Sequence, residues 1–304
     1  LMNQCRGLLD PRQHGFLPQK SCSTQMLQFC DSLSLSLNKN IRSDVIYFDF
    51  AKAFDSVNHD LILEKLKFSY GVNGKLLAFI KNYLSGRWQS VVVNGSVSNC
   101  LSVLSGVPQG SILGPSLFVL FINDITTGLS PGTDIMLYAD DTKIWREMVD
   151  DEDYHIIQRD INYLFDWAMR NKMKFHPSKC KVFSVASPTS YSSFFNTLPC
   201  VQYFYTMGNS ILDYTDSEKD LGIVMNSTLN FNDHANLLYG KANQKLGMIK
   251  RNCYFVSDTN RRKVLYLTLV RSIFEHCPSV WRPRSNAVID RLESLQKRAL
   301  KWIR

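Results

Sequence analysis

The sequence contains no apolar stretch long enough to cross a membrane and no cysteine pair at the spacing of a zinc site. The longest uncharged apolar run, residues 112–122, is far shorter than the roughly 20 residues that a membrane helix needs. None of the eight cysteines stands in a C-x-x-C pair. A long, core-rich chain does not depend on disulfides, so we expect reduced thiols and an intracellular protein without membrane contact.

Internal repeats and low-complexity tracts are also missing, and what remains is typical of a globular protein. The chain has 304 residues, of which 45% are hydrophobic and 12% aromatic, enough for one large core or several subdomains. No secretory signal stands at the start. The first residue is Leu1 rather than Met, and we expect the chain to be part of a longer protein.

Positive charge is concentrated in the last quarter of the chain. Residues 231–304 hold 15 Lys and Arg against 5 Asp and Glu, a net charge of +10, within a total of +8. The first 230 residues therefore carry a net charge of −2. Two interpretations stay open: a surface that faces a polyanion, or a set of solvated helix faces.

Apolar periodicity and turn residues predict alternating helices and strands. Helices are expected from a cap at Ser23, over 58–69, 73–85 and 115–125, over 151–173 until Pro177 stops the chain, and over 233–252, 258–275 and 285–303. Strands are expected over 44–50, 133–138, 142–148, 181–186 and 219–226, with a type I′ hairpin at Asn94-Gly95 and a small hairpin region within 187–218.

Carboxylates follow two of these strands. Asp49 ends the first strand, and Asp140 and Asp141 stand side by side at the turn between two others. Adjacent carboxylates repel, so either a solvated turn or a bound divalent cation must explain them. If the strands are neighbours in one sheet, Asp49 and Asp140 project at the same end and two hard cations can be held there.

A loop punctuated by glycine and proline, "SGVPQGSILGP" (105–115), stands between these carboxylates in the sequence. Its glycines allow a backbone to approach a ligand closely, and Gln109 offers both a donor and an acceptor. Each of these patterns alone also fits an ordinary loop or turn.

Together the motifs resemble those of one family. The segments "QHGFLPQKSCSTQML", "FDFAKAFDSVNHD", "SGVPQGSILGPSLFVLFINDI", "YADD", "HPSKCKVFSV", "KDLGIVM", "LVRSIFEHCPSVW" and "LESLQKRALKWIR" stand in the order of the reverse transcriptase motifs. The resemblance covers nearly the whole chain and is closest to non-LTR, LINE-type retrotransposons of the jockey or CR1 kind.

The resemblance implies an α+β right-hand polymerase. It predicts partial fingers over 1–43, a palm with an antiparallel sheet, embedded finger elements and a primer-grip-like hairpin over 44–230, and a basic helical thumb over 231–304. The implied reaction is RNA-directed DNA synthesis from dNTPs at a primer 3′-hydroxyl, with two Mg²⁺ ions or, alternatively, Mn²⁺. The implied partners are an RNA template and a DNA primer or target DNA, in the nucleus and cytoplasm.

The resemblance also implies a role for individual residues. Asp49, Asp140, Asp141 and the carbonyl of Phe50 would bind metal, and Lys179 would donate a proton to pyrophosphate. Phe54 would exclude the ribose 2′-hydroxyl, although it also fits an ordinary core aromatic residue. The template and nucleotide pocket would be lined by Gly106, Pro108, Gln109 and Gly110, the triphosphate would be contacted by Lys20, and the primer end would be steadied by Leu221 and Gly222. Asp55 recurs in the family pattern but equally suits a helix cap.

Some features depart from the family pattern. Where the family carries an arginine after Gly-Phe, Lys20 is the remaining basic candidate. The upstream finger strands are expected to be missing, and an endonuclease domain is expected elsewhere in the full-length chain. The alternative function is a non-catalytic nucleic-acid-binding relic of such a polymerase. A third hypothesis, RNA-templated RNA synthesis, is disfavoured by Phe54.

Overall fold

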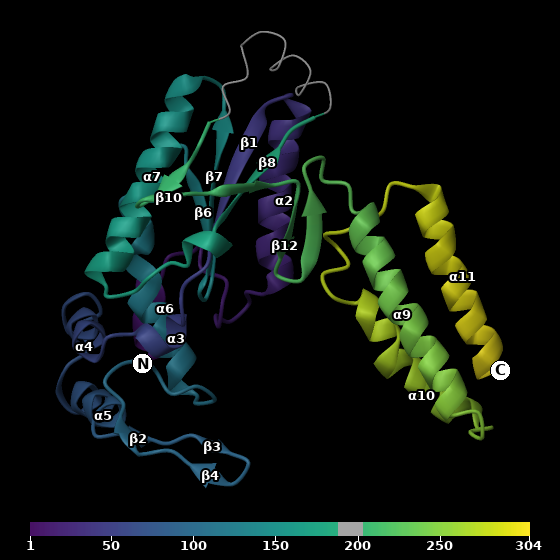
Figure 1. Cartoon of the computed structure of the whole chain (residues 1–304), viewed down its shortest axis with the longest axis horizontal. Helices are drawn as coiled ribbons and strands as arrows, with labels where there is room; N and C mark the ends of the chain where they lie inside the picture. Colours follow the sequence, from purple (N-terminus) through teal and green to yellow (C-terminus); the bar gives the residue numbers. More distant parts are fainter. Residues whose placement is uncertain (188–202) are drawn as a thin grey trace. The chain divides into compact units, whose positions relative to one another are not determined.

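The computed structural model describes residues 1–187 and 203–304, which form two compact units (Figure 1). The first unit contains Leu1–Ser21, Ser43–Val182 and a segment that ends at Tyr214; the second contains Cys22–Arg42 and Thr215–Arg304, with the residues after Val182. Neither unit is one continuous stretch of sequence. The division into fingers, palm and thumb is not tested by these units and stays a prediction.

A five-stranded sheet carries the residues of interest, and most of its strand residues belong to the first unit. Its order is β11 (Asp213–Thr215), β8 (Lys181–Val185), β1 (Arg42–Phe48), β7 (Asp141–Met148) and β6 (Asp134–Tyr138). Strands β6 and β7 are antiparallel, with Tyr138 opposite Asp141. Because β1 and β7 are neighbours, the sheet satisfies the condition that the sequence set for bringing Asp49 and Asp140 together.

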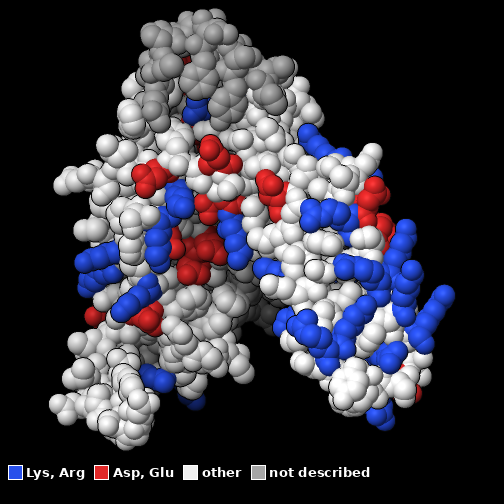
Figure 2. All heavy atoms as spheres, turned by 45° about the vertical axis from the view of Figure 1, so that its right-hand side comes forward, with Lys and Arg blue, Asp and Glu red and all other residues white. Residues whose placement is uncertain are grey.

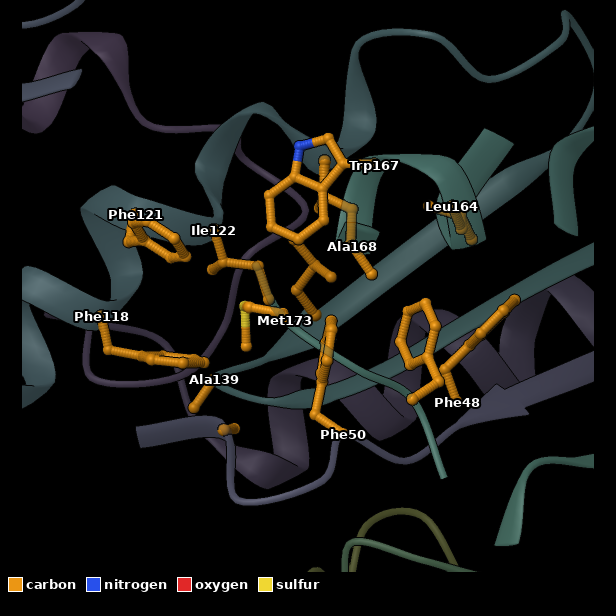
Figure 3. Close-up of a cluster of buried hydrophobic side chains, with 14 of the residues drawn as sticks. Phe48, Phe50, Phe118, Phe121, Ile122, Ala139, Leu164, Trp167, Ala168 and Met173 are labelled. Carbon is orange, nitrogen blue, oxygen red and sulfur yellow. The ribbon is translucent and has the colours of Figure 1, made fainter. Parts of the chain in front are cut away.

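Helices supply the apolar partners of this sheet. The first unit contains α1 (Met2–Cys5), α3 (Ala53–Ser56), α4 (His59–Phe68), α5 (Gly74–Leu84), α6 (Leu113–Ile122) and α7 (Asp151–Arg170). Helix α6 is apolar all round and buried from Leu117 to Ile122, as expected for a helix within a core. Figure 3 shows its Phe118 and Phe121 in one cluster with Trp167 of α7 and with Ala139.

Short strands complete the first unit. They are β2 (Trp88–Gln89), β3 (Val92–Val93), β4 (Ser96–Val97), β5 (Leu101–Ser102), β9 (Thr206–Met207) and β10 (Ser210–Ile211). The hairpin at Asn94-Gly95 is confirmed: β3 pairs with β4, and the two turn residues have φ of 49° and 83°, the signs that a type I′ turn requires. The β9–β10 hairpin falls within the expected 187–218 region, of which residues 188–202 lie outside the described part.

The second unit joins an N-terminal helix to the C-terminal helices. It contains α2 (Cys22–Asn38), β12 (Ser217–Asp220), β13 (Ile223–Asn226), α9 (Asn232–Asn252), α10 (Thr259–Leu269) and α11 (Asn286–Ile303). An apolar cluster joins the last three helices through Ala242, Leu246, Ile249, Tyr266, Val270, Leu295, Ala299 and Ile303. Ser23 of α2 donates a hydrogen bond to the Cys277 sulfur over 3.3 Å, so distant parts of the sequence meet here.

Several expected element boundaries were wrong. The helix expected over 151–173 ends at Arg170, well before Pro177, because Lys172 takes a positive φ of 57°. The strand over 219–226 is a hairpin, broken at Leu221 and Gly222. Helix α2 begins at Cys22, so Ser23 is not its cap, and α10 ends at Leu269 before a separate 3₁₀ turn.

The described part of the chain has no helix that is both long enough and apolar enough to span a membrane.

Helix α9 buries a histidine, which predicts a pH-dependent stability. His234 is 1% exposed, and its Nδ1 accepts a hydrogen bond from Val224 N over 3.2 Å. Burial, reinforced by the positive charges of His276 and Lys241, lowers the pKa of His234 from 6.5 to about 4. As the pH falls through this window, the unfolded chain binds a proton that the folded chain does not, so stability is lost.

We expect this histidine to cost up to about 3 kcal/mol of unfolding free energy between pH 6.5 and pH 4. Urea unfolding at pH 7 and pH 4.5 should therefore show that His234→Gln loses less unfolding free energy on acidification than wild type does. The exposed His155, changed to Gln, is the matched control and should behave like wild type. An equal decrease of the unfolding free energy between pH 7 and pH 4.5 in all three proteins would contradict the prediction.

Candidate active site

Asp49 directly follows buried strand β1, and its backbone is held from both sides. Its carbonyl oxygen accepts from His176 N over 2.8 Å, and its N–H donates to Cys180 Sγ over 3.4 Å. Burial raises the pKa of the Cys180 thiol to about 11, so the sulfur stays uncharged at neutral pH. The Asp49 side chain, 42% exposed, is thus presented to solvent from a fixed backbone.

The turn between β6 and β7 presents Asp140 in the same way. Ala139, just before it, has φ of 56° and is 4% exposed, a left-handed conformation that an L-residue adopts only when its surroundings compensate. Gln13 provides that support, because its Oε1 accepts from Ala139 N over 3.0 Å and from Gly15 N over 2.7 Å. The Gln13 side chain is 1% exposed, so the turn is held by a buried amide.

The segment around Gln13 continues the sheet beside β6. Leu137 N donates to Arg12 O over 3.1 Å, and His14 N donates to Leu137 O over 2.7 Å. A Cβ atom added to Gly15 would lie only 2.3 Å from Ala139 N, so only glycine allows this approach. Only the family resemblance draws attention to the motif "QHGF" in the sequence. Nothing in its local pattern connected Gln13 to a turn more than 120 residues later.

The two carboxylates interact electrostatically. Burial raises the pKa of Asp140, and the negative charge of Asp49 raises it further. A carboxylate whose ionisation is disfavoured by a second carboxylate suits a divalent cation, which prefers oxygen ligands and cancels the repulsion. Within the described residues, no three His, Cys, Asp or Glu side chains converge as ligands. The structure brings Asp49 and Asp140 together. The metal-binding roles of Asp49, Asp140, Asp141 and the Phe50 carbonyl stay predictions.

The glycine-rich loop is bonded to α3. Gly106 has φ of 91°, and a Cβ atom added to it would lie 2.8 Å from the Asp55 Cα. Gly106 N donates to Val57 O over 2.8 Å, and Gln109 Nε2 donates to Asp55 Oδ1 over 3.0 Å. Gln109 is therefore fixed by Asp55, for which the sequence allowed either a role in the family pattern or a helix cap.

Comparison with known proteins identifies the family. The family model described as "Reverse transcriptase (RNA-dependent DNA polymerase)" matches residues 1–225. The chain belongs to the reverse transcriptase family. It is 28% identical over 231 residues to the RNA-directed DNA polymerase from mobile element jockey of Drosophila funebris, covering 73% of the chain and 24% of that relative. It is 25% identical over 317 residues to the probable RNA-directed DNA polymerase from transposon BS of Drosophila melanogaster, covering 98% and 33%.

A solved telomerase structure shares the fold. Apo telomerase from Candida tropicalis aligns with a TM-score of 0.50 at 11% identity, covering 99% of this chain and 53% of that one. With the family match, this confirms the expected α+β right-hand polymerase fold, and the mobile-element relatives confirm the expected resemblance. The chain spans only about a quarter to a third of the curated relatives it matches.

Phe54, the reverse transcriptase's candidate for sugar selection, lies at the edge of the core. Its ring stacks on Phe118 with centroids 4.3 Å apart and meets Phe16 edge-on at 6.2 Å. Phe54 is half-buried, and Phe16 is 53% exposed. This position suits both interpretations from the sequence, because one face of the Phe54 ring supports the core while the rest of the side chain reaches the surface.

The two predicted basic residues have different surroundings. Lys179 Nζ lies 3.8 Å from Asp49 Oδ1, so the structure brings Lys179 to the reverse transcriptase's carboxylate pair. Both side chains are more than 40% exposed, and such an ion pair adds little stability. Lys20 Nζ instead donates to Pro11 O over 3.0 Å, within its own N-terminal segment.

The remaining predicted residues are in turns. Pro108 accepts a hydrogen bond from Ser111 Oγ over 2.6 Å, and Gly110, with φ of 76°, has open space around it. Leu221 and Gly222 form the turn of the β12–β13 hairpin in the second unit. That unit also carries the basic residues, and Figure 2 shows many Lys and Arg side chains on the face of its helices turned to the viewer.

The close approach of Gly15 to the turn gives a stability prediction. Gly15→Ala should lower the free energy of unfolding by about 1–3 kcal/mol, because its methyl group must displace the Ala139 backbone. The matched control is Gly7→Ala, where an added Cβ has no atom within 4 Å, and a change within about 0.5 kcal/mol is expected. Chemical denaturation measures both. Equal effects of the two substitutions would show that the close approach of Gly15 to Ala139 does not constrain the turn.

Proposed function

We propose that this chain carries out RNA-templated DNA synthesis for a non-LTR retrotransposon. The primer 3′-hydroxyl gives up its proton and attacks the α-phosphate of a dNTP to form a new phosphodiester bond. The bond between the α- and β-phosphates breaks, and pyrophosphate leaves. One observation carries the proposal, the closeness of two carboxylates. Asp49 follows β1 and Asp140 precedes the neighbouring strand β7, and the charge of Asp49 raises the pKa of Asp140. The family match supports this chemistry for such a carboxylate pair.

Two Mg²⁺ ions, or alternatively Mn²⁺, are the proposed cofactors. Asp49, Asp140, Asp141 and the carbonyl of Phe50 would hold them. When bound, the ions supply positive charge that activates the attacking hydroxyl and stabilises the leaving oxygens. The protein's own contribution is positioning, since Gln13 fixes the turn that carries Asp140 and Cys180 and His176 fix the backbone of Asp49.

The other predicted residues also have proposed roles. Lys179, beside Asp49, donates a proton to the leaving pyrophosphate. The loop with Gly106, Pro108, Gln109 and Gly110 lines the pocket for the template base and nucleotide, and its attachment to α3 keeps it beside Phe54. Lys20 contacts the triphosphate once it leaves Pro11, and the turn of Leu221 and Gly222 steadies the primer end.

The proposed partners are an RNA template, a DNA primer or target DNA, and dNTPs. The net charge of +10 over residues 231–304 supports backbone contacts to a nucleic acid. An endonuclease domain elsewhere in a longer chain and a place in the nucleus and cytoplasm belong to the same proposal. The second candidate function is a relic that binds nucleic acid without extending it; the exposed basic helices favour binding in either case.

Primer extension on poly(rA)/oligo(dT) with Mg²⁺ tests the proposal. Asp49→Asn and Asp140→Asn should each reduce extension to below a few per cent of wild type, because each removes a metal ligand. Asp140→Asn should also raise the melting temperature in metal-free buffer, since it removes the repulsion from Asp49. Added Mg²⁺ should then stabilise wild type but not this variant.

The exposed Asp166 on α7, changed to Asn, is the control and should keep full extension. A wild-type chain that binds the primer–template but never extends it would favour the relic. Extension above a few per cent by either carboxylate variant would overturn the metal assignment.

Sugar selection at Phe54 is a separate prediction. Phe54→Val should admit ribonucleotides, raising the ratio of rNTP to dNTP incorporation roughly ten- to hundredfold, because a 2′-hydroxyl no longer meets the ring. The loss of the stack on Phe118 should also destabilise the fold. Phe79→Val, at a residue that is 56% exposed, is the control for both measurements. A destabilised Phe54→Val with unchanged sugar discrimination would decide for a purely structural ring.

A further inference from the structure

The turn of the β12–β13 hairpin needs support from outside the hairpin. Leu221 and Gly222 both have positive φ, 44° and 89°, and connect the paired residues Asp220 and Ile223. This is the type I′ pattern, which strains Leu221 but not glycine. A two-stranded hairpin is only marginally stable by itself, so the position of the turn depends on what contacts it.

His276 makes that contact through its ring. Its Nε2 lies 2.7 Å from the carbonyl oxygen of Leu221. Because a carbonyl oxygen can only accept, Nε2 carries the hydrogen and donates it. The same nitrogen would lie 3.0 Å from a Cβ atom added to Gly222, so the ring covers the turn at the point where residue 222 has no side chain.

The backbone of His276 is itself held in place. Its carbonyl accepts from Trp281 Nε1 over 3.0 Å. The next residue, Cys277, is 3% exposed, adopts a φ of 48° and accepts from Ser23 Oγ over 3.3 Å. His276 is therefore an exposed side chain on a fixed backbone, which is the arrangement of a support rather than of a solvated surface residue.

The same network reaches the strand that follows the turn. The Trp281 ring packs edge-on against buried His234, with centroids 5.2 Å apart. His234 in turn accepts from Val224 N of β13. The hairpin is thus held at its turn by His276 and along β13 by His234, and Trp281 joins the two supports.

We propose that His276 is a positioning residue for the primer end, acting through the Leu221-Gly222 turn. This inference rests on the proposed function, in which that turn contacts the primer. His276 does not touch the reacting atoms. Its hydrogen bond fixes the Leu221 carbonyl and so the direction in which the turn presents its backbone to the primer. The loss of the bond should therefore weaken primer use without altering nucleotide use.

The test compares three substitutions that differ in the placement of a donor. His276→Gln puts an amide N–H close to where Nε2 stands, His276→Asn puts one nearer the backbone, and His276→Leu has none. Steady-state extension should show a primer–template KM raised roughly three- to tenfold in the Leu and Asn variants, from one lost hydrogen bond. The Gln variant should stay near wild type, and KM for dNTP should be unchanged in all three.

Further measurements separate this inference from the proposed function. His155→Gln, at an exposed residue of α7, is the control. Fluorescence anisotropy with a labelled primer–template, without dNTP, should rank the variants in the same way. The Leu and Asn variants should bind more weakly than wild type, and the Gln variant should bind about as tightly. If the Leu variant misfolds, the Gln and Asn variants still test the positioning role, because their side chains carry the same amide group and differ only in length.

Equal primer KM values for wild type and all variants, or a parallel rise in the dNTP KM, would overturn the positioning role while wild-type extension stands. A wild-type chain that neither binds nor extends the primer–template would overturn the proposed function itself, and this inference with it.

Discussion

Two carboxylates that repel each other have to be held at the ends of neighbouring strands, and much of the first unit serves this requirement. Asp140 can stand beside Asp49 because the residue before it is buried and fixed. Ala139 lies in the apolar cluster with Phe118 and Phe50 (Figure 3), and its N–H is bound by Gln13. Without these contacts, the repulsion and the left-handed φ of Ala139 would both favour opening of the turn.

The carboxylate that follows β1 is fixed by segments that come much later in the sequence. Phe50 stacks on Phe175 with centroids 4.3 Å apart, and Ala51 N donates to Lys174 O over 2.8 Å. These contacts, with the bonds from His176 and Cys180, tie the chain after β1 to the segment after α7. Asp49 and Asp140 are therefore solvent-facing side chains on a backbone that buried neighbours determine, which is the arrangement that catalysis by positioning requires.

The sequence predicted the parts of this arrangement that depend on local patterns. Strands β1, β6 and β7, the turn at Ala139-Asp140 and the Asn94-Gly95 hairpin follow from short apolar runs and turn residues, which act over a few residues. The role of Gln13 could not be predicted in the same way, because it depends on a contact with Ala139 that only the folded sheet creates. The helix over 151–173 was predicted too long for a related reason: apolar periodicity shows a buried face but not that Lys172 leaves the helical conformation.

The bond between Ser23 and Cys277 has a consequence for the order in which the protein is made. The two residues are 254 positions apart, and a ribosome adding about 5–20 residues per second needs on the order of tens of seconds to span them. During that time Ser23 and the rest of α2 have been synthesised, but Cys277, which accepts the hydrogen bond from Ser23, has not. The first helix of the second unit thus forms this bond only when the last quarter of the chain emerges.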